Sequence, residues 1–173
     1  MPRTVEVKAR LRDREAVEET VRSLADYGPE LIVQEDVFLC CENGRLKLRS
    51  FVDGRGELIL YRRPDIDGPA TSDFEKLPTE DPGGVRSLLT AAPGTTGEVR
   101  KRRTLHLVGQ TRVHLDEVEG LGDWLELEVV LGPDQTPNDG VRIADAPHGG
   151  FRDSRVGPRC GGLRRPHQST FQD

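Results

Sequence analysis

The 173-residue chain is poor in the residues that usually build a large hydrophobic core. Aromatic residues make up 5% of it, with one Trp and two Tyr, and there is one Met. Val, Leu, Ile and a few Phe must therefore form the core. Long hydrophobic runs are missing too: no stretch approaches the roughly 18 apolar residues of a membrane span. The N-terminus, MPRTVEVKAR, has no apolar segment of a secretory signal, so we expect a cytoplasmic protein without membrane contact.

Cysteines and excess positive charge are also scarce. Cys40, Cys41 and Cys160 are odd in number, two of them are adjacent, and none has a metal-binding CxxC spacing, so we interpret them as free thiols. The 25 Lys and Arg are outnumbered by 30 Asp and Glu, which gives a net charge of -5. This balance argues against a general binder of nucleic-acid duplexes or membrane surfaces. The length allows one domain, at most with appendages.

What the sequence does contain is alternation of apolar and charged residues. In residues 4–11, Val5 and Val7 alternate with Glu6 and Lys8, which is typical of a strand. Asn43-Gly44 predicts a tight hairpin between a strand starting near residue 31 and the next one. Further strands are predicted over 45–51, 56–64, 97–109, 111–118 and 123–131.

Two or three helices accompany these strands. Asp13 can cap a helix with Val17 and Val21 on its apolar face, which ends before Gly28-Pro29. Asp81-Pro82 looks like a cap followed by Pro in the first turn. A short helix is predicted to begin at Thr136-Pro137. Each helix has one apolar face, which must cover something beside it.

The charged faces of the strands are sorted by sign, which solvation alone does not explain. Middle strands carry mainly Lys and Arg, whereas the first and last carry the carboxylates. If the sheet closes with these faces inside, the apolar faces point outward under the helices. Buried charges need partners, and a ligand with several phosphates together with a divalent cation suits both signs. The inward positions are Glu6, Lys8, Lys47, Arg49, Arg62, Lys101, Arg103, His114, Asp116, Glu126 and Glu128.

At these residues the sequence resembles the CYTH domain family, the triphosphate tunnel metalloenzymes, from about residue 4 to residue 141. The resemblance is carried by TVEVKARL, QEDVF, NGRLKLR, LILYRRPD, VRKRRTLH and, most specifically, VHLDEVEGLGDWLELEVV. It implies an α+β fold, an eight-stranded antiparallel β-barrel with flanking helices, whose tunnel binds a triphosphate with Mg2+ or Mn2+.

The resemblance also implies residue roles. Lys8 matches the lysine of the family's ExExK strand and is the candidate catalytic residue. The phosphate-binding residues would be Lys8, Lys47, Arg49, Arg62, Lys101 and Arg103, and the metal ligands Glu6, Asp116, Glu126 and Glu128. Thr4 stands where the first acid of ExExK belongs, which leaves the number of ions open. We interpret His114 as structural, and Trp124 and Phe38 as outward core residues.

The reaction remains open between alternatives. In a hydrolase, water attacks the terminal phosphorus, and Lys8, with a pKa lowered by cationic neighbours, is a candidate base. In a class IV adenylyl cyclase, the ribose 3'-hydroxyl of ATP attacks the α-phosphorus. Hydrolysis is favoured because it demands fewer specific contacts. A non-catalytic module that binds polyphosphate or a nucleotide is the third alternative, and a homodimer is left open.

The last segment, residues 147–173, departs from the CYTH domain predicted over 1–146. It is rich in Arg, Gly and Pro and has no periodicity, so we expect a disordered tail. Freely chosen synonymous codons for residues 147–167, read one base later, encode LMAAFGIPESDLVAGAYVDLI. That frame would extend the final helix and end as this family usually does. We therefore hypothesise that the tail is a frameshift product, which the coding DNA would test.

Overall fold

The structure, a computed structural model, describes residues 3–62, 70–145 and 156–160. Three helices and nine strands of the described residues follow one another in this order: β1 (Arg3–Leu11), α1 (Arg14–Leu24), β2 (Tyr27–Leu39), β3 (Arg45–Phe51), β4 (Gly56–Arg62), β5 (Ala70–Thr79), α2 (Pro82–Ala91), β6 (Thr95–Val108), β7 (Thr111–Val118), β8 (Gly122–Val130), α3 (Pro137–Asp145) and β9 (Val156–Cys160).

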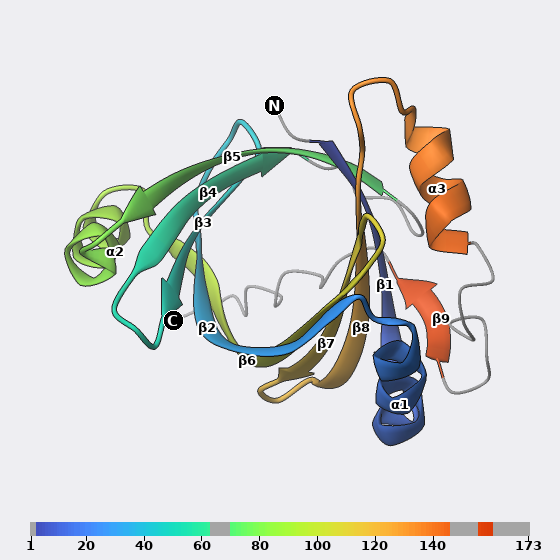
Figure 1. Cartoon of the computed structure of the whole chain (residues 1–173). Helices are drawn as coiled ribbons and strands as arrows, with labels where there is room; N and C mark the ends of the chain where they lie inside the picture. Colours follow the sequence, from blue (N-terminus) through green and yellow to red (C-terminus); the bar gives the residue numbers. More distant parts are fainter. Residues whose placement is uncertain (1–2, 63–69, 146–155, 161–173) are drawn as a thin grey trace.

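Eight of these strands close into an antiparallel barrel. The order is β5-β4-β3-β2-β6-β7-β8-β1, and β1 pairs back with β5 to complete the ring (Figure 1). That closing contact comprises four register pairs, Arg3–Glu6 with Asp73–Ala70, whereas β1 and β8 share seven. The prediction of a closed eight-stranded antiparallel barrel with flanking helices is thus confirmed.

The helices begin where the sequence predicts. Asp13 caps α1 by accepting a hydrogen bond from the Ala16 amide at 3.0 Å, and Asp81 caps α2 through the Gly84 amide at 2.8 Å. At the start of α3, the Thr136 amide donates to Asp139 Oδ2 at 2.8 Å. Such side-chain acceptors satisfy amides that have no partner within the helix.

The hydrophobic core lies outside the barrel, between the strands and two helices. Val17 and Val21 of α1 pack with Val113 and Leu115 of β7. Under α3, Val5, Val129 and Leu131 form a second cluster. A Cβ on Gly140 would lie 2.6 Å from Val5 Cγ2, so α3 approaches β1 this closely because residue 140 has no side chain. The outward apolar faces therefore have the covering that the alternation predicted.

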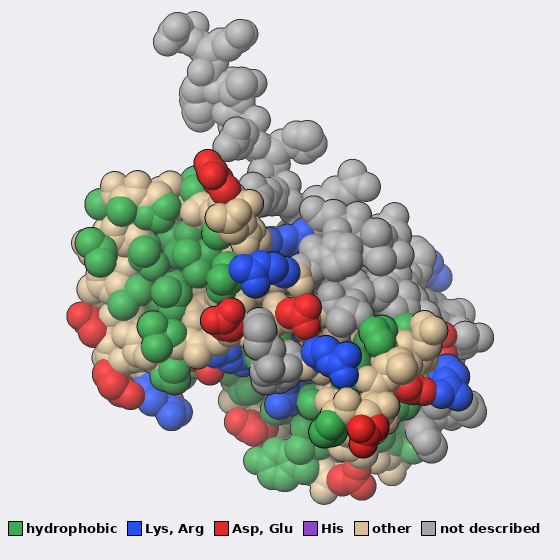
Figure 2. All heavy atoms as spheres, turned by 90° about the horizontal axis from the view of Figure 1, so that it is seen from above, with side chains coloured by type: hydrophobic (Ala, Val, Ile, Leu, Met, Phe, Trp, Pro, Cys, Tyr) green, Lys and Arg blue, Asp and Glu red, His purple; other side chains and the backbone are tan. Residues whose placement is uncertain are grey.

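Helix α2 covers its strands less completely than α1 and α3 do. Figure 2 shows hydrophobic side chains gathered on the side of the molecule where β4, β5 and α2 lie, and Leu77 and Leu88 are 66% and 69% exposed. Among the described residues, no helix combines the length and the apolar character that crossing a membrane requires.

Two strands were not singled out in the sequence. β5 carries charged residues and Pro78 in place of a clean alternation. β9 falls within the segment expected to be a disordered tail, yet residues 156–160 pair with the second half of β1. The remainder of 147–173 lies outside the described residues, and the frameshift hypothesis stays a prediction.

Candidate functional site

Charged side chains gather inside the barrel around a central cavity of about 160 Å³, called the tunnel below. Directly opposed residues of paired strands share a face of the sheet, and the register places Lys8 opposite Glu126 and Glu126 opposite His114. The predicted site residues that line the tunnel are Glu6, Lys8, Lys47, Arg49, Lys101, Arg103, Glu126 and Glu128.

A first group, the β2/β3 clamp, consists of Asp36, Lys47 and Arg49. Asp36 lies directly opposite Arg49 and is 3% exposed. Lys47 Nζ donates to Asp36 Oδ2 at 2.8 Å, and Arg49 donates through Nε to Oδ1 at 2.8 Å and through Nη2 to Oδ2 at 3.0 Å. Burial alone would raise the pKa of Asp36, but Lys47 and Arg49 more than offset it and hold that pKa well below its usual range.

A second group, the β6/β7 clamp, consists of Asp116, Lys101 and Arg103. Asp116 lies directly opposite Arg103 and is 4% exposed. Lys101 Nζ donates to Asp116 Oδ2 at 2.9 Å, and Arg103 donates through Nε to Oδ1 and through Nη2 to Oδ2, both at 2.7 Å. Asp116 is thus close to the tunnel-lining residues, and both of its oxygens accept hydrogen bonds from cations; its role as a metal ligand stays a prediction.

Glu126 links the β6/β7 clamp to the first strand. It accepts a hydrogen bond from Arg103 Nη2, and its other oxygen lies 3.1 Å from Lys8 Nζ. Beyond it, Glu6 and Glu128 face one another across β1 and β8, and Arg112 donates to Glu128 at 3.1 Å. The carboxylates therefore occupy one wall of the tunnel, as the sorting of charges predicted.

Two of the candidate lysines, Lys8 and Lys47, have pKa values shifted in opposite directions. Burial lowers the pKa of Lys8, but Glu126 and Glu6 outweigh it, so this pKa is raised. The expectation that cationic neighbours lower the pKa of Lys8 is wrong, because its nearest charges are carboxylates. Burial, and then the neighbouring Arg49, lower the pKa of Lys47 to about 7. Lys47 is therefore the lysine that can lose its proton near neutral pH.

Arg62 does not line the tunnel. Ile59 and Tyr61 of β4 point inward, with Tyr61 opposite Arg45, and the alternation turns Arg62 to the exposed side. The face of β4 that was predicted to point inward is therefore the wrong one, because charged residues were assigned to the inward face.

The CYTH domain family model matches residues 2–154. The chain belongs to the CYTH domain family. No curated protein matches the chain. The match ends eight residues beyond the boundary predicted at 146.

Solved structures share this CYTH fold. The PH1012 protein of Pyrococcus horikoshii OT3 is 25% identical, with 93% of this chain and 97% of that chain covered and a TM-score of 0.74. A candidate adenylate cyclase of Vibrio parahaemolyticus is 20% identical, with 82% and 86% covered and a TM-score of 0.63. A Hippeastrum protein described with a dominant triphosphatase activity is 17% identical, with 84% and 85% covered and a TM-score of 0.60.

Several tunnel residues of this CYTH protein were missed from the sequence. Asp36 belongs to the QEDVF motif, but no role was assigned to it from the sequence. His114, interpreted as structural, and Phe38, interpreted as outward, both line the tunnel. Trp124 also belongs to the inward face, because it lies opposite Asp116. Burial and the neighbouring Arg103 lower the pKa of His114 to about 3, so its imidazole is neutral at physiological pH. Alternation along β7 and β8 already gives His114 and Trp124 the same face as Asp116 and Glu126, whereas the contacts of Asp36 depend on the register between β2 and β3.

The carboxylate wall has the donor chemistry that a CYTH metal site needs. Glu6, Glu126 and Glu128 supply the hard oxygen ligands that Mg2+ and Mn2+ prefer. Two carboxylates placed directly opposite one another repel unless a cation lies between them. Within the described residues, no three His, Cys, Asp or Glu side chains come close enough to hold an ion. Metal binding by this wall stays a prediction; Glu126 pairs with Lys8 and Arg103, and Glu128 pairs with Arg112.

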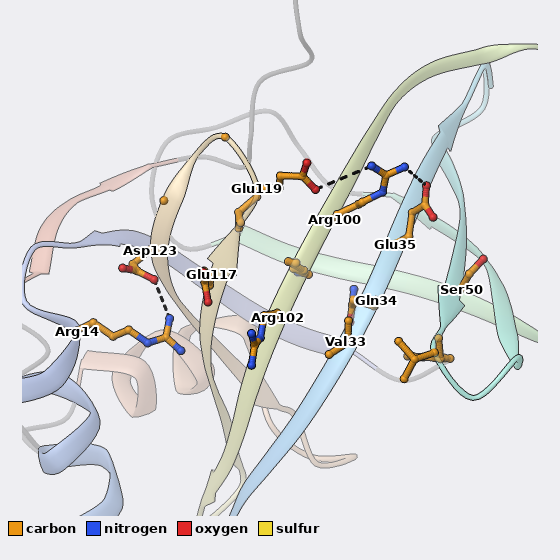
Figure 3. Close-up of a pocket in the computed structure, with 16 residues that line it drawn as sticks. Arg14, Val33, Gln34, Glu35, Ser50, Arg100, Arg102, Glu117, Glu119 and Asp123 are labelled. Carbon is orange, nitrogen blue, oxygen red and sulfur yellow. Dashed lines mark hydrogen bonds and ion pairs between the residues drawn. The ribbon is translucent and has the colours of Figure 1, made fainter.

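A second cavity of about 850 Å³ adjoins the tunnel, and Lys101 lines both. Figure 3 shows Arg100 extending from β6 between Glu35 and Glu119, and Arg14 of α1 paired with Asp123. Apolar atoms of Val33, Phe51, Val52 and Val118 also line this cavity. It is far larger than the tunnel, and ion pairs and apolar side chains line it together.

Proposed function

We propose that this CYTH protein binds a triphosphate in the tunnel and hydrolyses it with the help of a divalent cation, Mg2+ or Mn2+. One observation carries the proposal: cationic side chains from β1, β3 and β6 converge on a cavity of about 160 Å³ whose opposite wall is acidic. A chain of phosphates needs several cations, and carboxylates beside them would serve a pure polyanion binder poorly.

The side chains of the tunnel can perform the required steps largely by position and charge. Phosphoryl transfer depends on holding the phosphates and neutralising the charge that develops on them. Arg49 and Arg103 keep fixed charge at all relevant pH values. Lys8, whose pKa is raised, stays protonated and can neutralise a phosphate oxygen next to Glu126. Glu6, Glu126 and Glu128 would hold the divalent cation, which supplies Lewis-acid polarisation of the phosphoryl oxygens when bound.

Adenylyl cyclisation is the second candidate, and the 850 Å³ cavity favours it. Because Lys101 lines both cavities, an organic group attached to a triphosphate in the tunnel would have room there. The Vibrio parahaemolyticus neighbour is named a candidate adenylate cyclase, and the Hippeastrum neighbour is named a candidate adenylyl cyclase and described with a dominant triphosphatase activity.

A product assay tests these proposals. The purified protein would be incubated with tripolyphosphate, thiamine triphosphate or ATP and with Mg2+ or Mn2+, and products identified by mass. Glu126→Gln is the blank, and Glu19→Gln, at an exposed carboxylate of α1 that lines neither cavity, is the matched control. Orthophosphate released only when Glu126 is present supports hydrolysis, whereas cyclic AMP with pyrophosphate supports cyclisation. Binding of triphosphate without any product would identify a non-catalytic module.

A further inference from the structure

A carboxylate without an assigned role lies within the cationic wall of the tunnel. Asp36 belongs to neither the phosphate-binding cations nor the acidic wall of Glu6, Glu126 and Glu128. It lines the tunnel, is 3% exposed, and opposes by its charge the entry of an anion. A buried charge is tolerated when its partners stabilise it. The partners of Asp36 are therefore the place to find its role.

The partners of Asp36 repeat, atom for atom, those of Asp116. In both clamps the aspartate accepts from a lysine Nζ through Oδ2, from an arginine Nε through Oδ1, and from the same arginine's Nη2 through Oδ2. In both, lysine and arginine are two residues apart on one strand and the aspartate lies opposite the arginine on the neighbouring strand. The shared geometry indicates a shared task, which is to fix a Lys-x-Arg pair.

We propose that Asp36 is a positioning residue that orients Lys47 and Arg49 for the phosphates of the substrate. The bidentate contact fixes the plane of the Arg49 guanidinium and leaves Nη1 outside these bonds. Lys47 uses one of its three N–H groups on Asp36 and keeps two. Gln34 donates to Asp36 Oδ1 at 3.1 Å and holds the carboxylate in turn. This inference rests on the proposed triphosphate binding.

Asp36 also determines whether Lys47 carries a proton. Lys47 faces Asp36 of β2, Arg45 and Arg49 of its own strand, Tyr61 of β4, Lys76 of β5 and Lys101 of β6. Burial, Arg49 and Lys101 lower the pKa of Lys47, whereas Asp36 raises it, with the balance at about 7. Without the carboxylate, Lys47 would lose its proton at a lower pH, and the tunnel would lose a cation.

Calorimetric titration with tripolyphosphate tests this role. Asp36→Asn is expected to weaken binding at pH 7 by at least about tenfold, because one cation loses charge and another its orientation. Asp53→Asn, which removes an exposed carboxylate from the β3–β4 turn, is the matched control and should bind normally. If Asp36 only opposed the anion, its removal would tighten binding, and that result would overturn the inference.

The pH profile separates positioning from a merely structural role. The ratio of dissociation constants, Asp36→Asn over unsubstituted protein, should be largest near pH 7 and shrink towards pH 5.5, where Lys47 is protonated in both proteins. Adding Lys47→Arg to Asp36→Asn should restore part of the affinity at pH 7, because arginine keeps its charge. A ratio that does not change with pH, together with no rescue, would overturn the role.

Asp36→Glu covers the case in which the asparagine variant does not fold. It keeps the negative charge but displaces the carboxylate by one methylene, so weaker binding is again expected. Unchanged affinity of Asp36→Glu would contradict positioning. If the unsubstituted protein itself does not bind tripolyphosphate, the proposed function fails and this inference with it; normal binding combined with unaffected Asp36 variants removes the inference alone.

Discussion

The two clamps have the same internal geometry but different surroundings. The β6/β7 clamp continues through Arg103 to Glu126 and from there to Lys8. A further hydrogen bond to the β2/β3 clamp comes from the neutral Gln34. One clamp therefore belongs to a network of ion pairs that alternates in sign, whereas the described residues show no ion pair that links the other clamp to a second carboxylate. We infer that phosphate binds at the β2/β3 clamp to cations that lie away from the acidic wall. At the β6/β7 clamp it binds to cations that lie next to this wall.

The comparison predicts unequal losses when each arginine is removed. Arg103→Ala should cost about 3 to 5 kcal/mol of unfolding free energy, because it removes the arginine that two buried carboxylates, Asp116 and Glu126, share. Arg49→Ala should cost less, about 1 to 3 kcal/mol, since Lys47 still pairs with Asp36. Chemical denaturation of both variants measures the difference. Equal losses would show that the link to Glu126 contributes nothing to stability.

Removal of the linking carboxylate should affect catalysis more than folding. Glu126→Gln is expected to lower kcat by about 100-fold or more, since the acidic wall loses its central ligand. Steady-state turnover with Mg2+ or Mn2+ measures this, and circular dichroism reports whether the variant is folded. Turnover at the unsubstituted rate would exclude Glu126 from the reaction.

Acid titration should distinguish Asp36 from an ordinary surface carboxylate. Its pKa in the folded protein is well below 3.8, the value for an unperturbed aspartate. The ionised Asp36 therefore stabilises the folded protein fully above about pH 4, and this stabilisation is lost as pH falls through the pKa of Asp36 in the folded protein. The difference in unfolding free energy between unsubstituted protein and Asp36→Asn should decrease as pH falls below 3.8. A difference that persists at the lowest accessible pH would contradict the charge-based account.

The smallest effect is expected at Arg62. Because Arg62 is exposed and does not line the tunnel, Arg62→Ala should change tripolyphosphate affinity by less than about twofold, as typical surface substitutions do. Arg49→Ala, on the neighbouring strand, is the comparison. A tenfold weakening in Arg62→Ala would place this residue back among the phosphate-binding cations.

The sequence predicted the barrel because alternation recurs on strand after strand with the charges sorted by sign. It predicted the helix starts because Asp13 and Asp81 cap them through local hydrogen bonds. It failed on β5, where charged residues and Pro78 hide the alternation. Asp36 was also not recognised, because its contacts depend on the register between β2 and β3. The shift at Lys8 could not be predicted either, because it depends on the distance to Glu126.

The seam between β1 and β5 has a consequence for motion. Among the described residues the ring closes there through four register pairs, and β1 is held along its other edge by seven. Fewer shared amides make this seam the place where the wall separates most readily. Backbone amides of residues 70–73 should then exchange with solvent deuterium before those of β6 and β7. Glu6 stands at the end of this seam, so each opening would bring the acidic wall into contact with bulk water.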